Sequence, residues 1–160
     1  MDPRVSDEPG FIIVGIGART DNAREMAGAG VIAKLWARIF KENLLAQVPN
    51  KTDTSILAVY SEYASDKDGE YDFMIGARVS SAMGVPDGMI VKEVPAGRYA
   101  IFTSERGPVE KVVVGVWQKI WAVAKAAPGG ERAYQVDFEV YDERARDPRN
   151  AQVDVYVSIK

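Results

Sequence analysis

Apolar residues recur along this chain with two different spacings. Short stretches alternate apolar and polar residues, or are rich in β-branched side chains, as strands are. Two longer stretches place apolar residues three and four positions apart, which is typical of amphipathic helices. The predicted strands are 11–17, 55–63, 71–80, 89–94, 98–104, 134–141 and 153–159, and the predicted helices are 31–45 and 109–125. This order predicts an α+β fold with a mainly antiparallel sheet and two main helices that cover part of it.

The two helical stretches carry the same pattern. Ten residues from Val31 align without a gap with ten residues from Val112, at an offset of 112 − 31 = 81, so that Trp36 matches Trp117. The copies are too long and too few for a solenoid. We therefore predict one domain over 1–160, built from a duplicated β-α-β-β unit with half-repeats at about 9–80 and 93–160. The halves should pack about a pseudo-twofold axis, and the seam between them is a natural place for a ligand cleft.

The composition removes several classes of chemistry. The 160 residues contain no histidine and no cysteine. Nucleophilic catalysis by Ser-His or Cys-His pairs, ordinary zinc sites and disulfides are therefore excluded. We expect no metal and no cofactor, and any chemistry has to come from Asp, Glu, Tyr, Lys, Arg or Ser.

Charge and hydropathy limit the partners. The net charge of −3 argues against a surface that binds nucleic acid, and the chain leaves no room for a helix-turn-helix segment. No apolar run approaches the ~18 residues of a membrane span, and the acidic N-terminus does not look like a signal peptide. We expect a cytoplasmic protein that contacts neither nucleic acid nor membrane directly.

One strand carries an unusual number of polar side chains. In the stretch 136–141, Asp137, Glu139 and Tyr141 share one face, whereas the apolar residues share the other. On periodicity alone, the face with the carboxylates should look at water.

Several segments together resemble the gyrase-inhibitor-like, or AraC-type, effector-binding superfamily, in the form of a stand-alone member like those of mobile integron cassettes. These segments are Ile32-x-x-Leu35-Trp36-x-x-Ile39-Phe40, Gly69-Glu-Tyr-Asp-Phe-Met-Ile-Gly76, Val94-Pro-Ala-Gly-Arg-Tyr-Ala-Ile-Phe102, Trp117-x-x-Ile120-Trp121 and Asp137-Phe-Glu-Val-Tyr141. No single motif decides the matter, but their order and spacing cover nearly the whole chain. The family fold is a duplicated β-α-β-β unit, as the internal repeat predicts.

The resemblance changes the expectation for the polar strand. In such domains the groove between the halves binds small organic molecules, often lipophilic cations, and the glutamate of the Phe-Glu-x-Tyr strand lies at the bottom of the pocket. By motif that residue is Glu139. The aromatic wall residues that the resemblance suggests are Tyr60, Tyr141, Tyr156, Trp36 and Trp117.

Three functions are compatible with these residues. We favour non-enzymatic binding of a small lipophilic, cationic aromatic molecule with Glu139 as its counter-ion, and no catalytic residue. A small-molecule hydrolase is one alternative, with Glu139 as base or nucleophile and Tyr60 or Tyr141 as acid. A protein-interaction module of the gyrase-inhibitor type is the other, and its protein partner would be unknown.

Overall fold

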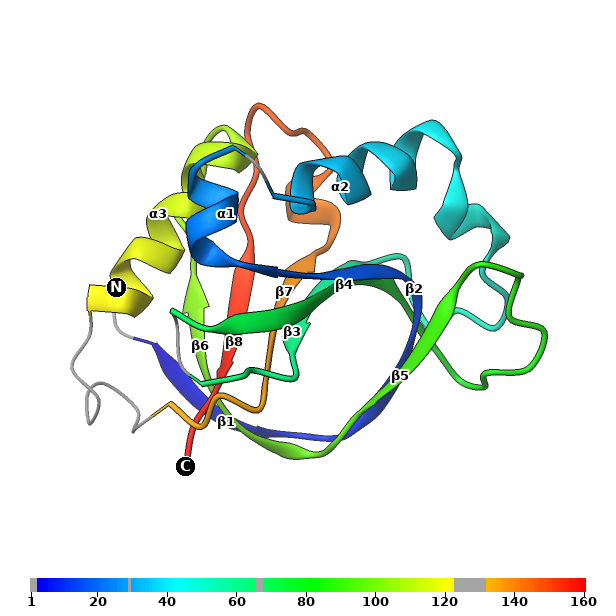
Figure 1. Cartoon of the computed structure of the whole chain (residues 1–160), viewed down its shortest axis with the longest axis horizontal. Coiled ribbons are helices and arrows are strands. Elements are labelled where there is room, and N and C mark those ends of the chain that lie inside the picture. The colour runs from blue at the N-terminus through cyan, green and yellow to red at the C-terminus, as the bar shows by residue number, and fades with distance from the viewer. Residues whose placement is uncertain (1–2, 29, 66–67, 123–131) are drawn as a thin grey trace.

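An eight-stranded antiparallel sheet forms the body of the molecule (Figure 1). The computed structural model describes residues 3–28, 30–65, 68–122 and 132–160. The strands are β1 (Arg4–Glu8), β2 (Phe11–Asp21), β3 (Ile56–Ser61), β4 (Glu70–Val79), β5 (Ile90–Val94), β6 (Gly97–Thr103), β7 (Val136–Tyr141) and β8 (Asp154–Ser158). The helices are α1 (Asn22–Met26), α2 (Ile32–Lys41) and α3 (Val109–Ala122), with short 3-10 helices η1 (Leu44–Gln47) and η2 (Glu143–Ala145).

The strand order shows the duplication directly. The order is β1-β6-β8-β7-β3-β4-β2-β5, so β3 and β7 meet at the centre, and each is followed outward by two strands of its own half, β4 and β2 on one side and β8 and β6 on the other. The edge strands are exchanged, because β1 pairs with β6 and β5 pairs with β2. In one half α2 connects β2 to β3, and in the other α3 connects β6 to β7. The predicted fold class, an α+β fold with a duplicated β-α-β-β unit, is confirmed. The exact limits of the half-repeats stay a prediction.

The sheet is so strongly curved that it returns on itself. β1 runs on into β2, and β5 runs on into β6, and the two ladders between them share one register: Glu8 pairs with Gly97, and Phe11 pairs with Val94. Figure 1 shows the resulting ring of strands. Glycine makes the close approach within it possible, because a Cβ at Gly15 would lie 1.9 Å from the backbone oxygen of Ile75. Gly15 therefore lies within β2 at a point where two backbones approach closely.

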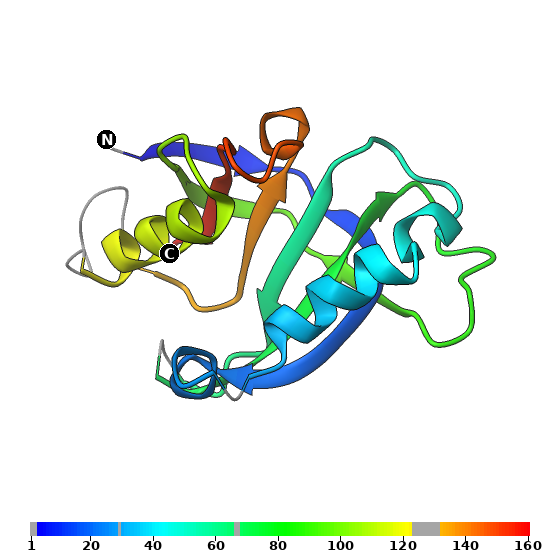
Figure 2. The same ribbon diagram turned by 90° about the horizontal axis from the view of Figure 1, so that it is seen from above.

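The two faces of the sheet carry separate cores. One face buries aliphatic and aromatic residues of the central strands, among them Leu57, Val59 and Phe138. The opposite face is covered by the two main helices. Leu35 and Ile39 of α2 pack over one half of the sheet, and Val116, Trp117 and Ile120 of α3 pack over the other. Seen from above, β3 and β7 run between α2 and α3 (Figure 2).

Local boundaries differ from the sequence prediction in three places. β1 was not predicted because its residues are mostly polar and exposed, and α1 was not predicted because its five residues bury no side chain. The first predicted helix is interrupted at Asn43, which has a positive φ of 51° and precedes η1. The predicted end of the second helix lies outside the described residues. Within the described ranges, no helix is long and apolar enough to cross a membrane.

Candidate functional site

The carboxylate of Glu139 lies at the centre of the helix-covered face. The residue sits in the middle of β7, where it pairs with Ala58 of β3 and Val155 of β8, and it is only 1% exposed. The prediction from periodicity, that this face looks at water, was wrong. The strand alternates as expected, but α2 and α3 cover the face that carries the carboxylates.

Three side chains donate hydrogen bonds to this carboxylate. Oε2 accepts from the Tyr60 hydroxyl at 2.7 Å and from Trp117 Nε1 at 2.6 Å, and Oε1 accepts from the Tyr141 hydroxyl at 2.5 Å. An ionised carboxylate has only acceptor sites, so this set of donors suits the charged form. The three donors come from β3, α3 and β7, and therefore from both halves of the fold.

The internal repeat explains why these side chains converge. The 81-residue offset relates Ala58 to Glu139, Tyr60 to Tyr141 and Trp36 to Trp117. Ala58 and Glu139 are direct partners across the central strand pair, so the pseudo-twofold axis passes between them. Glu139 consequently stands where equivalent side chains of both halves can reach it.

Two equivalent aromatic pairs flank the carboxylate. The rings of Trp117 and Tyr60 lie 5.1 Å apart in an edge-to-face arrangement, and those of Trp36 and Tyr141 lie 4.8 Å apart in the same arrangement. The pairs differ in one respect. Trp117 is 8% exposed and bonds to Glu139, whereas Trp36 is half-buried and stacks on Phe40, which is 65% exposed.

Burial dominates the electrostatics of this site. It raises the pKa of the Glu139 carboxyl, while the hydrogen bonds from Tyr141, Trp117 and Tyr60 act against that rise. Burial and the nearby Glu139 charge raise the pKa of both tyrosine hydroxyls well above the ordinary value, so both remain protonated donors.

A second buried carboxylate lies two residues away on the same face. Asp137 is fully buried, and its Oδ1 accepts hydrogen bonds from the backbone and side chain of Ser158 at 2.8 and 3.1 Å. Its Oδ2 accepts from the Tyr63 hydroxyl at 2.5 Å and from Arg132 at 2.8 Å. Sequence reasoning grouped Asp137 with the solvent-facing side chains, and the only signal for its burial was its shared face with Glu139.

Arg132 is the partner that distinguishes this second carboxylate. Burial alone would lower the pKa of its guanidinium, but Asp137 and Tyr63 outweigh that effect and raise it. The guanidinium therefore stays charged beside Asp137. Glu139 has no comparable partner within the described ranges, where its hydrogen-bond donors are all neutral.

The structure does not bring Tyr156 to this site. Residues directly opposite each other in a ladder share a face, and Tyr156 pairs with Phe138, whereas Glu139 pairs with Val155. Tyr156 stacks on Phe138 with the ring centroids 4.6 Å apart. It therefore lies on the opposite face of the sheet. The other five predicted residues, Glu139, Tyr60, Tyr141, Trp36 and Trp117, do lie together.

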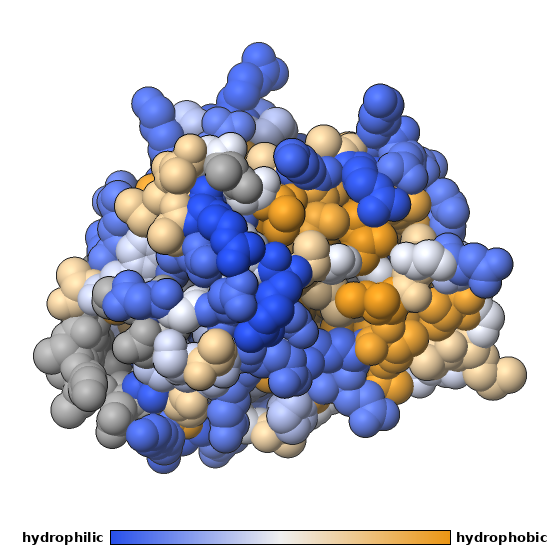
Figure 3. All heavy atoms as spheres, in the orientation of Figure 1, coloured by the Kyte–Doolittle hydropathy of each residue, from blue (hydrophilic) through white to orange (hydrophobic). Residues whose placement is uncertain are grey.

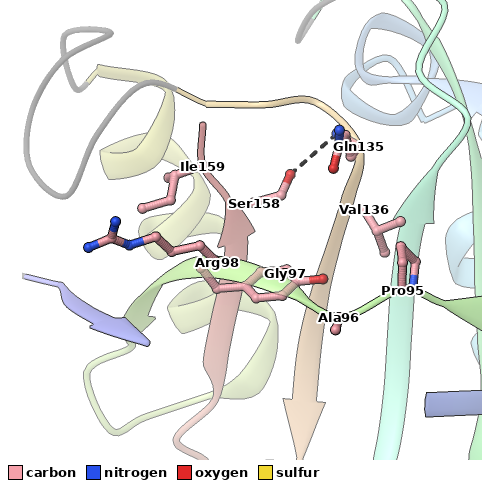
Figure 4. Close-up of a pocket in the computed structure, with 9 residues that line it drawn as sticks. Pro95, Ala96, Gly97, Arg98, Gln135, Val136, Ser158 and Ile159 are labelled. Atoms are coloured by element: carbon pink, nitrogen blue, oxygen red, sulfur yellow. Dashed lines mark hydrogen bonds between the residues drawn. The ribbon is translucent and has the colours of Figure 1, made fainter. Parts of the chain in front are cut away.

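A small hollow lies elsewhere on the molecule, at the turn into β6 and the start of β7 (Figure 4). Gln135 and Ser158 line one side of it, and Pro95 and Gly97 line the other. Its volume of about 30 Å³ leaves room for only a few water molecules. This hollow is too small for an organic ligand and contains none of the predicted site residues.

Comparison with known proteins now places the chain. Residues 4–159 match the model of the Cass2 family, which is described as integron-associated effector binding protein. The chain belongs to the Cass2 family. This membership confirms the predicted effector-binding family and, with it, the binding of a small-molecule effector. Within the described residues, no group of three or more acidic, histidine or cysteine side chains is arranged to hold a metal ion.

Relatives of known sequence agree with this membership. The chain is 37% identical over 147 residues to YobU of Bacillus subtilis, which is described as a transcriptional regulator, and the match covers 91% of this chain and 90% of that protein. It is 32% identical over 161 residues to the transcriptional regulator BrlR of Pseudomonas aeruginosa. This match covers 99% of the chain but only 56% of BrlR.

Solved structures share the fold. The integron cassette protein VCH_CASS2 of Vibrio cholerae superposes with a TM-score of 0.76 at 26% identity, covering 99% of this chain and 96% of the other. SAV2435, solved with tetraphenylphosphonium bound, superposes with a TM-score of 0.77 at 19% identity, covering 100% of this chain and 94% of the other.

Proposed function

We propose that this protein binds small lipophilic aromatic cations, and that Glu139 is the counter-ion. The observation that carries the proposal is a carboxylate that is 1% exposed and bonded only to neutral donors within the described ranges. Burial of a carboxylate without an opposite charge costs free energy. A positively charged ligand offsets that cost, which an uncharged ligand of the same shape cannot do.

The surrounding rings suit the same class of ligand. A cation over the face of an aromatic ring gains on the order of 0.5–2 kcal/mol. The apolar part of the ligand gains about 25 cal/mol for each Å² that it removes from water. Tyr60, Tyr141, Trp36 and Trp117 can supply both contributions. None of these contacts demands one particular molecular shape, so we expect a range of ligands.

The side of entry follows from the difference between the two aromatic pairs. Trp36 and Phe40 on α2 are partly exposed, whereas Trp117 on α3 is held by its bond to Glu139. Hydrophobic surface lies immediately beside α2 in Figure 3. We expect the ligand to enter on the α2 side, and the Trp36–Tyr141 pair to move aside while the Trp117–Tyr60 pair stays in place.

A solved structure of the same fold supports this ligand class. SAV2435 has the same fold, and its solved complex contains tetraphenylphosphonium, a bulky aromatic cation. The chain's own arrangement also favours binding over hydrolysis. The hydroxyls of Tyr60 and Tyr141, which a hydrolase would need as acids, both donate to Glu139.

A thermal-shift screen tests the ligand class. Aromatic cations, neutral molecules and anions of similar size are added to the protein, because a ligand that binds only the folded state raises its melting temperature. We expect tetraphenylphosphonium to raise the melting temperature and triphenylphosphine oxide, which is neutral, to raise it far less. A larger shift from neutral or anionic compounds would overturn the proposal.

An incubation with reactive compounds separates a binder from a hydrolase. Reactive aromatic esters and other electrophiles are held with the protein and then analysed by mass spectrometry. A binder returns them unchanged. Catalytic product formation that disappears in Glu139→Gln would replace the binding proposal with a hydrolase.

A further inference from the structure

Two buried carboxylates stand side by side on β7, and among the described residues only one of them has a cationic partner. Asp137 and Glu139 are two positions apart on the same face, so their Cα atoms lie roughly 6.6 Å from each other. Asp137 is paired with Arg132 at 2.8 Å. Glu139 is bonded to the neutral donors Tyr60, Trp117 and Tyr141.

Arg132 is held in the way that the proposed ligand would be held. Its guanidinium carbon lies 4.3 Å from the ring centroid of Tyr134 and 5.9 Å from that of Trp117. The side chain is 15% exposed, and its Nε is buried without a hydrogen-bond partner. A cation enclosed by aromatic faces and a carboxylate is thus already present in the folded chain.

The site of Arg132 and the site of Glu139 are contiguous. The indole of Trp117 faces Arg132 with its ring and donates its N–H to Glu139. On the other side, Tyr63 donates to Asp137 and Tyr60 donates to Glu139, and both rings contact Tyr71. A molecule bound at Glu139 would therefore lie one ring away from the guanidinium.

We infer that Arg132 is a built-in cation that fills the Asp137 half of this buried site and thereby restricts the ligand to a single positive charge. The described side chains of the site contribute two carboxylates and one guanidinium, which leaves one negative charge to be neutralised. This inference rests on the proposed function. A purely structural ion pair would stabilise the fold equally well, but it would not set the charge of the ligand.

Two ligands of matched shape provide the test. N-methyl-phenylpyridinium and methyl viologen are both flat two-ring molecules, but the first carries one positive charge and the second carries two. Their dissociation constants are measured by calorimetry for the wild type and four variants: Arg132→Gln, Asp137→Asn, the double variant, and Arg149→Gln. Arg149 is an exposed arginine of the same half, so its variant controls for the general loss of a positive charge.

The net charge of the pair should decide the selectivity. The wild type and Arg149→Gln should bind the monocation at least as tightly as the dication. Arg132→Gln should improve the affinity for the dication relative to the monocation roughly tenfold or more, since Asp137 is then free to pair with the second charge. Asp137→Asn leaves Arg132 positive and unpaired, so both ligands should weaken, and the dication should weaken more.

The double variant keeps the test decisive even if a single variant is unstable. Removing both charges makes the Asp137 half of the site neutral again, and the wild-type preference should return. The same dication-to-monocation ratio in the wild type, Arg132→Gln and the double variant would overturn the inference.

Glu139→Gln, measured alongside, separates the two proposals. One outcome is that Glu139→Gln loses monocation binding while Arg132→Gln keeps the wild-type ratio of dication to monocation affinity. That result would support the proposed function and contradict only the inference that Arg132 limits the charge of the ligand. Failure of the wild type to bind either ligand would overturn both.

Discussion

The two halves of this protein have the same frame but different centres. Offset by 81 residues, both halves supply a tyrosine and a tryptophan around the pseudo-axis, yet the axis position itself is Ala58 in one half and Glu139 in the other. Duplication therefore provides two similar aromatic walls, and one unequal residue supplies the charge. Because Glu139 stands at the axis, it accepts from both equivalent tyrosines, Tyr60 and Tyr141.

The two aromatic walls, Trp117–Tyr60 and Trp36–Tyr141, have the same composition, but they are not held equally firmly. Trp117 is held by its N–H bond to Glu139, whereas its counterpart Trp36 contacts Tyr141 and the exposed Phe40. A site with one fixed wall and one less constrained wall can admit ligands of different thickness. The asymmetry of the centre thus also makes the walls unequal.

The largest effect on stability should follow from placing a carboxylate at both axis positions, 58 and 139. Ala58→Glu places a second carboxylate beside Glu139 in a fully buried position. Added volume and like charge should lower the free energy of unfolding by roughly 3 kcal/mol or more, measured by urea denaturation. The exchange variant Ala58→Glu/Glu139→Ala has one carboxylate again and should recover much of that loss. No recovery would show that the two axis positions are not equivalent.

Trp117 and Trp36 should differ when each is shortened. Trp117→Phe removes the N–H donor from a buried carboxylate and should cost about 2 kcal/mol of unfolding free energy. Trp36→Phe removes no bond to Glu139, so we expect roughly half that cost or less. Equal losses in chemical denaturation would contradict the view that only one wall is fixed.

The raised pKa of Glu139 predicts the sign of a pH effect. Between the ordinary carboxyl value of 4.5 and the raised value in the folded state, the folded chain binds more protons than the unfolded chain. The unfolding free energy of the ligand-free protein should therefore fall as the pH rises through this window. Asp142 has a lowered pKa, so its opposite contribution lies below 3.8.

Glu139→Gln is the control for this pH effect. The glutamine does not titrate, so the variant should lose the part of the slope that comes from Glu139, as measured by thermal or urea unfolding at a series of pH values. A slope that persists unchanged in the variant would assign the effect to another group.

The smallest effect is expected at Tyr156. This residue lies on the opposite face of the sheet, so Tyr156→Phe should change cation affinity by less than about 0.5 kcal/mol. Tyr141→Phe, which removes a donor from Glu139, should change it by about 1 kcal/mol. A larger loss for Tyr156→Phe would return that residue to the site.

The repeat made most of the fold predictable. Periodicity located the main strands and the two main helices, and the 81-residue offset related Trp36 to Trp117. β1 and α1 were not predicted, because they bury few or no apolar side chains and their sequences therefore carry no periodic signal.

The features of the site that could not be predicted from the sequence depend on tertiary contacts. Alternation along β7 placed Asp137 and Glu139 on one face, but it could not show that helices from both halves cover that face. Whether Tyr156 shares the face depends on the register between β7 and β8, which a single sequence does not reveal. The pairing of Asp137 with Arg132 depends likewise on how the chain enters β7.

Calorimetric titration of tetraphenylphosphonium into the wild type, Glu139→Gln and Glu143→Gln tests the central claim most directly. Glu143 is an exposed glutamate of the same half and serves as the matched control. We predict that Glu139→Gln loses about 1–3 kcal/mol of binding free energy while Glu143→Gln binds like the wild type. Equal binding by Glu139→Gln and the wild type would contradict the account, since the ligand would then be recognised without the buried charge.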